Sequence, residues 1–176
     1  MIRPLALRAA LAVLALATLA GCKANLVPMC PAVRVDNATA SVTKFRDASA
    51  RAPGDLEYRA DILGFKGECD FGKEKVDVTF SVDFAVTGGP AAKGGNAQLY
   101  YFVAIPQFFP DTNGKQVVIA RARLPERNAQ RQTFTENDVH VTIPLKKDQA
   151  GAAFDIYVGF QVDAAQLEYN RSQSTR

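Results

Sequence analysis

The chain has 176 residues, of which 48% are apolar and 22% are charged, and its formal net charge is +3. This size and balance are typical of one soluble globular domain and exclude collagen-like, coiled-coil and disordered chains. The 12 glycines and 9 prolines follow no period, and alternating Val and Phe dominate the middle of the chain. The body is therefore predicted to be all-β.

The first 21 residues differ in composition from the rest of the chain. Arg3 and Arg8 give this stretch a positive start, and Leu11–Ala20 contains almost only Leu, Ala and Val. This order is typical of an export signal, and the apolar run is shorter than the roughly 20 residues that a helix needs to cross a bilayer. We therefore predict that residues 1–21 are a signal peptide that is removed.

The leader ends in Leu19-Ala20-Gly21-Cys22, which resembles the lipobox of bacterial lipoproteins. The resemblance implies that cleavage occurs before Cys22, that its thiol carries a diacylglyceryl group and that its new amine is acylated. Two or three fatty chains anchor a protein durably, because each buried methylene contributes about 0.8 kcal/mol. The alternative is a secreted protein in which Cys22 pairs with another thiol.

The same resemblance implies a location at the membrane of the bacterial cell envelope, on the periplasmic side. Lys23 follows the cysteine. In enteric bacteria an Asp at that position favours retention in the inner membrane, so Lys23 favours the outer membrane. An exported protein does not ordinarily meet nucleic acid, and the charge balance gives no indication of such a partner.

Cleavage would leave 155 residues with a net charge of +1, because two arginines leave with the signal. A domain of that size buries about 68–70% of the surface of its unfolded chain, so its core needs no metal or cofactor, and none is predicted. Cys30 and Cys69 are then the remaining thiols in an oxidising compartment, and we predict a disulfide between them. Closing a loop of about 40 residues would stabilise the fold by roughly 4 kcal/mol. A buried pair of free thiols is the alternative.

Residues 22–37 contain two prolines and no clear period, so they are predicted to be a tether. The domain is expected to span residues 38–163, and a C-terminal turn and polar tail to follow at 164–176. Its first two strands are predicted at Ala38–Asp47 and Leu56–Phe65. The segment Ala52-Pro53-Gly54-Asp55 supplies turn chemistry between them.

The clearest strand is predicted at Val76–Val86. Six apolar residues alternate there with Asp, Thr, Ser and Ala, which places one face against a core and the other in water. Leu99–Ile105 is apolar on both faces, as expected of a central or covered strand. Further strands are predicted at Lys115–Leu124, Val139–Ile143 and Phe154–Val162.

Seven short strands separated by turn signals predict a single antiparallel sandwich that resembles immunoglobulin or fibronectin type III domains in architecture. The chain has no Trp, and its cysteines are not placed as in antibody domains. A small closed barrel would use the same alternation and is the alternative fold. Gly159-Phe160-Gln161 with Gln166–Arg171 resembles the ending of uncharacterised proteobacterial lipoproteins, which implies no known activity.

The residues that carry catalysis elsewhere are few, and the chain is predicted not to be an enzyme. His140 is the only histidine, and its place between two inward valines directs it to solvent. Asp111-Thr112-Asn113-Gly114 begins like a calcium loop but lacks the later acidic ligands, so it is predicted to be a turn. Asp77 and Asp83 share one strand face but lie six residues apart, about 20 Å, and are expected to be solvated.

Two features are candidates for a partner surface. Phe108 and Phe109 lie in a connection between strands, where they either close the core, which we predict, or stand exposed for a partner. The second feature is a series of arginines that runs from a strand face into a loop, namely Arg121, Arg123, Arg127 and Arg131. A solvated face is the default for such residues, but on a tethered protein they would also suit anionic lipid or an acidic partner.

These observations support two hypotheses of function. The first is a non-enzymatic binding or assembly module, in which edge strands or loops contact another protein of the envelope, for example by strand addition. The second is a carrier of an apolar ligand or a glycan, with an interior that opens near Phe108 and Phe109. A filled interior would favour the first, and a cavity of some hundreds of cubic ångströms the second.

Overall fold

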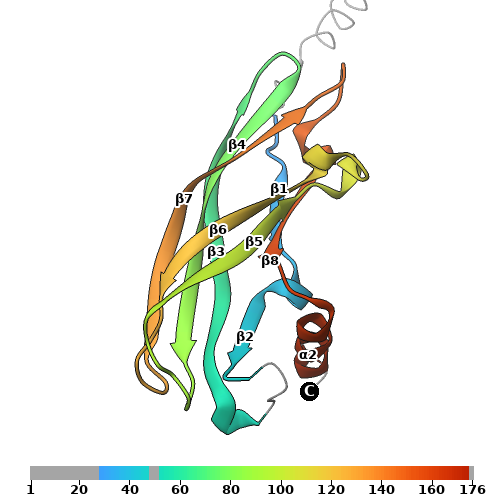
Figure 1. Cartoon of the computed structure of the whole chain (residues 1–176). Coiled ribbons are helices and arrows are strands. Elements are labelled where there is room, and N and C mark those ends of the chain that lie inside the picture. Colours follow the sequence, from blue (N-terminus) through green and yellow to red (C-terminus); the bar gives the residue numbers. More distant parts are fainter. Residues whose placement is uncertain (1–27, 48–51, 175–176) are drawn as a thin grey trace, which may run out of the picture.

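The structure is a computed structural model that describes residues 28–47 and 52–174. The predicted signal peptide, the lipidation of Cys22 and the role of Lys23 lie outside the described residues. Within them, the chain forms two four-stranded sheets packed as a sandwich, with one C-terminal helix (Figure 1). This confirms a mostly β fold with two separate sheets, so the alternative of a closed barrel is wrong for the described residues.

The described chain contains eight strands: β1 (Ala32–Val35), β2 (Ser41–Phe45), β3 (Leu56–Phe71), β4 (Lys75–Gly88), β5 (Asn96–Ala104), β6 (Lys115–Arg123), β7 (Arg131–Pro144) and β8 (Asp155–Phe160). One sheet, called sheet A here, has the order β1-β8-β5-β6, and the other, sheet B, has the order β2-β3-β4-β7. All neighbours are antiparallel except β1 and β8, which are parallel. Short 3-10 turns are η1 (Asn37–Thr39), η2 (Pro53–Asp55), η3 (Pro106–Phe108), η4 (Thr112–Gly114) and η5 (Gly151–Ala153), and the helix is α2 (Ala164–Ser174).

The alternation in β4 forms the centre of the core, as predicted. Its residues Val76, Val78, Phe80, Val82, Phe84 and Val86 are all buried. The Phe84 ring lies at the middle, with centroid distances of 5.3 Å to Tyr101, 5.1 Å to Phe134 and 5.8 Å to Phe160. Because these partners come from β5, β7 and β8, one aromatic side chain links both sheets.

Several strand boundaries differ from the prediction. The first predicted strand shortens to β2, because residues 37–39 form η1 instead. The second extends to Phe71, through a bulge between Ile62 and Gly64. β7 begins at Arg131 rather than Val139, and its pairing with β4 shifts register around Asp138, which has φ 58°. A bulge reverses the side-chain alternation, so neither β3 nor β7 reads as one continuous strand in the sequence.

β1 lies within residues 22–37, the stretch predicted to be a tether. It pairs in parallel with β8, so the sandwich begins by Ala32. The disulfide between Cys30 and Cys69 is confirmed, with a Cα–Cα distance of 5.9 Å. It joins the segment in front of β1 to β3 and attaches the N-terminal part of the body to sheet B.

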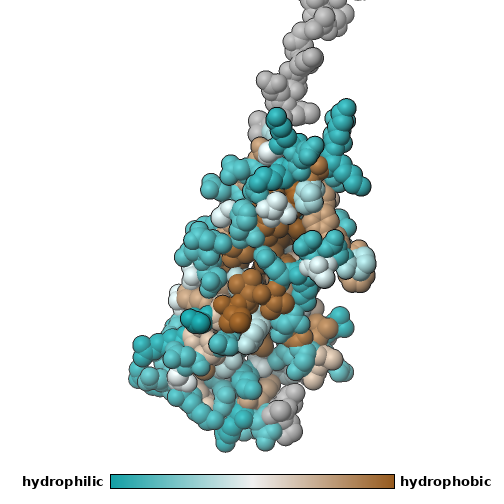
Figure 2. Space-filling model, turned by 45° about the horizontal axis from the view of Figure 1, so that its top comes forward, coloured by the Kyte–Doolittle hydropathy of each residue, from teal (hydrophilic) through white to brown (hydrophobic). Residues whose placement is uncertain are grey.

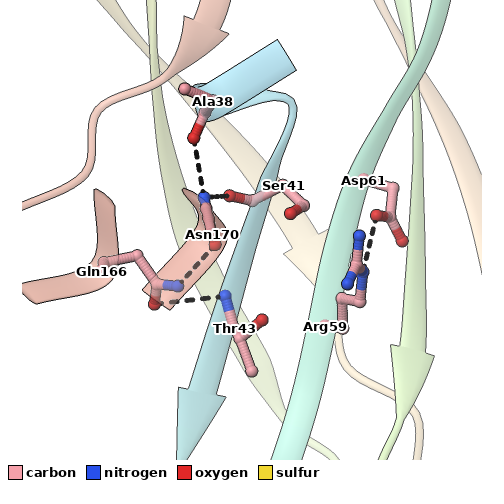
Figure 3. A network of polar contacts seen from close by, with 7 residues as sticks. All are labelled: Ala38, Ser41, Thr43, Arg59, Asp61, Gln166 and Asn170. Atoms are coloured by element: carbon pink, nitrogen blue, oxygen red, sulfur yellow. Dashed lines mark hydrogen bonds and ion pairs between the residues drawn. The ribbon is translucent and has the colours of Figure 1, made fainter. Parts of the chain in front are cut away.

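The C-terminal helix α2 is longer than the predicted turn and packs beside β2 (Figure 1). The Asn170 side chain is buried and donates to the carbonyl oxygens of Ala38, at 2.9 Å, and Ser41, at 2.8 Å. One turn earlier, the Gln166 side chain accepts from the Thr43 amide at 3.3 Å (Figure 3). These bonds satisfy backbone groups next to the short strand β2 and fix the helix against it.

Candidate functional site

An apolar patch lies on the outer face of sheet A. The register of the two strands places Tyr100 opposite Ile119 and Phe102 opposite Val117, and we call these four residues the β5–β6 patch. Tyr100, Val117 and Ile119 are 45%, 50% and 48% exposed. Figure 2 shows apolar side chains gathered in the middle of this face. β5 is central in its sheet, as predicted, but its outer face is open rather than covered.

The Phe102 ring is held against its neighbours within this patch. Gly159 is its partner on β8, and a Cβ there would come within 2.8 Å of the ring. On the opposite side, the Lys115 ammonium nitrogen lies 4.6 Å from the centroid of the ring, in a cation–π contact. The absence of a side chain at Gly159 therefore makes room for this ring beside β8.

Cationic side chains border the patch along β6. Lys115 lies at one end, and Arg121 and Arg123 lie at the other, opposite Gln98 and Asn96. All three cations are exposed and form no ion pair within the described residues. The outer face of β6 therefore combines an apolar centre with positively charged ends.

The predicted series of four arginines does not form one strip. Arg121 and Arg123 share the outer face of β6, as predicted. Arg127 lies in the connection that follows, and Arg131 begins β7 in the other sheet, opposite Thr87. Thr87 follows the inward Val86, so Arg131 points to the outer face of sheet B. The alternation of residues within one strand was readable, but the change of sheet between the strands was not.

Phe108 and Phe109 have different environments. Phe108 packs on the core cluster, with its ring centroid 5.4 Å from that of Phe154, so the predicted closing of the core is confirmed for this residue. Phe109 is 85% exposed, and the same prediction is wrong for it. Because η3 ends at Phe108, the next side chain points away from the sandwich.

The outer edges of β6 and β7 meet along one side of the sandwich, which we call the β6–β7 seam. The strands do not pair there, and the Gln116 side chain reaches across to donate to the carbonyl oxygen of His140 at 3.4 Å. On one side of this bridge lies a pocket of about 540 Å³, lined in part by Val103, Ile105 and Phe108. On the other side lies a pocket of about 230 Å³.

The smaller pocket is lined in part by Tyr101 and Glu136. Tyr101 is fully buried, and its hydroxyl has no hydrogen-bond partner among the described residues. Burial, with a smaller effect from the charge of Glu136, raises the pKa of Tyr101 to about 12. The alternation of β5 predicts that this side chain points inward, but the sequence carries no signal that its hydroxyl would lack a partner.

The polar residues considered for chemistry lie on the surface. His140 is exposed, with Nδ1 3.2 Å from the Thr79 hydroxyl and Nε2 3.7 Å from Asp77. Hydrogen bonds from Lys75 and Thr142 lower the pKa of Asp77. This network joins neighbouring strands on the outer face of sheet B, and its members His140 and Thr142 also line the pocket of about 540 Å³.

The remaining acidic candidates have local partners. The Asp83 carboxylate accepts from the Thr135 hydroxyl at 2.6 Å. Asp111 accepts the Asn113 amide at 2.9 Å and caps η4, which confirms the predicted turn. No group of three or more His, Cys, Asp or Glu side chains within the described residues is arranged to hold a metal ion.

Comparisons with models of protein families, with curated proteins and with solved structures find no match to this chain. In the part of the chain that the structure describes, no helix has the length and apolar character required to cross a membrane. The arguments about function that follow therefore rest on the residues themselves.

Proposed function

We propose that this chain is a lipid-anchored, non-enzymatic binding module of the bacterial cell envelope, exposed on the periplasmic side. The leader that ends in Leu19-Ala20-Gly21-Cys22 supports export and acylation. The disulfide between Cys30 and Cys69 is compatible with an oxidising compartment. Lys23 supports attachment to the outer membrane.

The observation that carries the binding role is the β5–β6 patch. An open apolar surface with cationic ends has an energetic cost in water, and such surfaces mark interaction sites more often than isolated exposed residues do. The acyl chains would hold this face near the proteins of the membrane. The partner class proposed is an envelope protein.

We also propose that the sandwich belongs with immunoglobulin-like and fibronectin-like domains at the level of architecture. Two packed sheets and mostly antiparallel pairing support this grouping. The strand orders β1-β8-β5-β6 and β2-β3-β4-β7 are not those of the antibody constant domain, so the grouping does not extend to topology.

Anchoring is tested with the wild-type chain and Cys22→Ala in a bacterial host that acylates lipoproteins. Mass spectrometry of the wild-type protein should find a diacylglyceryl group and an N-acyl chain on Cys22, and the protein should fractionate with membranes. Cys22→Ala should be soluble or remain unprocessed. An unmodified N-terminus on wild-type protein from membranes would contradict the proposal. Lys23→Asp, expressed in an enteric host, tests which membrane holds the protein. This variant should be found in the inner membrane instead of the outer membrane.

The binding role is tested by crosslinking in intact cells. Ile119→Lys places a charge in the β5–β6 patch and should abolish crosslinks to a partner, while the protein still folds and reaches the membrane. Thr133→Lys is the matched control, because it changes an exposed strand residue of the other sheet. Equal crosslinking in both variants would contradict a binding role for the patch.

A second candidate function is a carrier of an apolar ligand or a glycan. The pocket of about 540 Å³ beside Phe108 favours it, because this volume lies in the range of small-molecule sites. Organic extracts of natively purified protein should then contain one lipid or glycan at about one copy per chain. Extracts without such a molecule would count against the carrier.

A further inference from the structure

The free edges of the two sheets differ in how they are protected against pairing. β1 has four residues, and β2 has five, with a register shift at Lys44/Phe45 and α2 packed beside it. The part of β3 that extends past β2 contains a bulge. β7 contains a bulge as well. Short strands, bulges and charged side chains are the usual devices that prevent edge-to-edge pairing. β6 is neither short nor bulged, because its nine residues pair with β5 without interruption, and its charged side chains lie on either side of an apolar centre.

The hydrogen bonds between β5 and β6 show which backbone N–H and C=O groups of β6 face its free edge. The Ile105 amide donates to the Gly114 carbonyl, and the Leu124 amide donates to the Gly95 carbonyl, both at 2.8 Å. Hydrogen-bonded pairs alternate along an antiparallel ladder, so the even-numbered residues of β6 bond to β5. The odd-numbered residues therefore direct their N–H and C=O groups away from β5. Val117, Ile119 and Arg121 are among them, and they also carry the apolar and cationic side chains of the outer face.

The inner side of this edge has space and an unsatisfied polar group. The pocket of about 230 Å³ lies beside Val118, on the inner side of β6, and Tyr101 lines it. The Tyr101 hydroxyl is buried and has no hydrogen-bond partner in the part of the chain that the structure describes. A strand placed next to β6 would direct alternate side chains toward this pocket and the others toward the β5–β6 patch.

We propose that β6 receives an added strand: an extended segment of an envelope protein, with apolar residues opposite Val117 and Ile119 and carboxylates opposite Arg121 and Arg123. The inference rests on the proposed binding function and names the edge and its partner chemistry. Backbone bonds supply affinity in this mode, and alternate side chains supply specificity. A polar side chain of the added strand facing inward reaches the Tyr101 hydroxyl.

Charge disfavours a second copy of this chain as the occupant in the two registers that align the centres of the strands. If two β6 strands paired antiparallel about Val118, Lys115 of each would oppose Arg121 of the other. If they paired about Ile119, Lys115 would oppose Arg123. Like charges directly opposite each other destabilise a strand pair. An acidic segment of another protein reverses the sign of these contacts.

The test uses the purified full chain, held in nanodiscs where Cys22 is acylated and free in solution where it is not, and a synthetic nine-residue peptide, the length of β6. The peptide has the sequence Glu-Thr-Glu-Thr-Val-Thr-Val-Thr-Glu. A control peptide carries Lys in place of every Glu. Amide hydrogen exchange is followed by NMR. On binding, exchange at Ile119 and Arg121 should slow by at least about tenfold, because their amides gain acceptors. The amide of Ala120, already bonded to β5, should change little.

Two variants separate the backbone from the side chains. Ile119→Pro removes an amide at the free edge and should weaken binding by at least about tenfold, whereas Ile119→Thr keeps that amide and should weaken it less. Arg121→Glu with Arg123→Glu should reverse the preference, so that the Lys peptide binds about tenfold more tightly than the Glu peptide. This double variant keeps the test decisive if Ile119→Pro does not fold.

Three outcomes would overturn the proposal: no binding at millimolar peptide, equal binding of the two peptides, or new protection on β7 or β3 instead of β6. None of these readouts depends on acylation of Cys22. Failure of anchoring would therefore appear when the fractionation of the wild-type chain and Cys22→Ala is compared. The peptide result is independent of that comparison.

Discussion

Replacement of Tyr101 by Phe should stabilise the protein. The side chain is fully buried, and its hydroxyl has no hydrogen-bond partner among the described residues. A buried polar group without a partner costs about 1–3 kcal/mol. Tyr101→Phe removes the hydroxyl and keeps the ring that packs 5.3 Å from Phe84. We expect the free energy of unfolding to rise by about 1–2 kcal/mol.

Urea denaturation and calorimetry measure this effect. For a domain of this size, each kcal/mol raises the melting temperature by about 2–4 °C. Tyr100→Phe is the matched control, because Tyr100 is exposed and its hydroxyl donates to Gln98 at 2.9 Å on the surface. The control should change the free energy of unfolding by less than about 0.5 kcal/mol. A loss of stability in Tyr101→Phe would refute the reasoning, since it would mean that the hydroxyl is satisfied.

The same tyrosine predicts a dependence of stability on alkaline pH. Its pKa in the folded protein is about 12, raised by burial and by Glu136, whereas an unfolded tyrosine titrates near about 10. A raised pKa favours the folded state while the group is protonated, so this contribution is complete below pH 10 and falls as the pH rises from 10 towards 12. Tyr101→Phe should reduce the slope of unfolding free energy against pH in this range. An unchanged slope would mean that another group controls it.

Three other predictions concern the fold. Phe84→Ala should lower the free energy of unfolding by about 3–5 kcal/mol, because it leaves a cavity between the two sheets. Phe109→Ala, at an exposed side chain, should change it by less than about 0.5 kcal/mol. Similar losses for the two variants in urea denaturation would contradict the difference in burial between the two rings. Reduction of the Cys30–Cys69 disulfide, whose cysteines are 39 residues apart, should lower the free energy of unfolding by about 4 kcal/mol in the chain-entropy model. Calorimetry with and without reductant measures this effect, and an unchanged melting temperature would contradict the prediction. Asn170→Ala should lower the free energy of unfolding by about 1–3 kcal/mol, since the Asn170 side-chain amide donates to two carbonyl oxygens. Amide hydrogen exchange should then become faster first in β2. An equal increase throughout the domain would argue against local anchoring of β2 by α2.

The sequence predicts the parts of this fold that depend on local alternation. β4 and β8 bury every second residue, and this pattern identifies a strand and its inward face without knowledge of its partner. The disulfide was also predictable, because only two thiols remain once Cys22 is assigned to lipid. For the candidate site, the outward direction of Arg121 and Arg123 follows from the same alternation within β6.

The features that were not predicted depend on partners that are distant in the chain. β1 has four residues and gains its hydrogen bonds from β8, more than 100 positions away. The first half of β7 carries mainly polar residues and is a strand because β4 supplies its ladder. The β5–β6 patch was missed because Val117 and Ile119 are apolar, and an apolar residue in a strand does not show in the sequence that its face is open.

The unsatisfied hydroxyl and the long, regular edge of β6 occur in the same place, and this coincidence is the strongest argument for a site there. Each alone has an ordinary cost: a buried hydroxyl lowers stability, and a free edge invites association. Elsewhere, the described chain avoids both costs, with bulges in β3 and β7 and with Asn170 bonding the backbone beside β2. Departures from otherwise consistent local rules are expected where a protein meets its ligand. Because Tyr101 lies on the strand that pairs with β6, a strand added there would remove both costs in a single binding event.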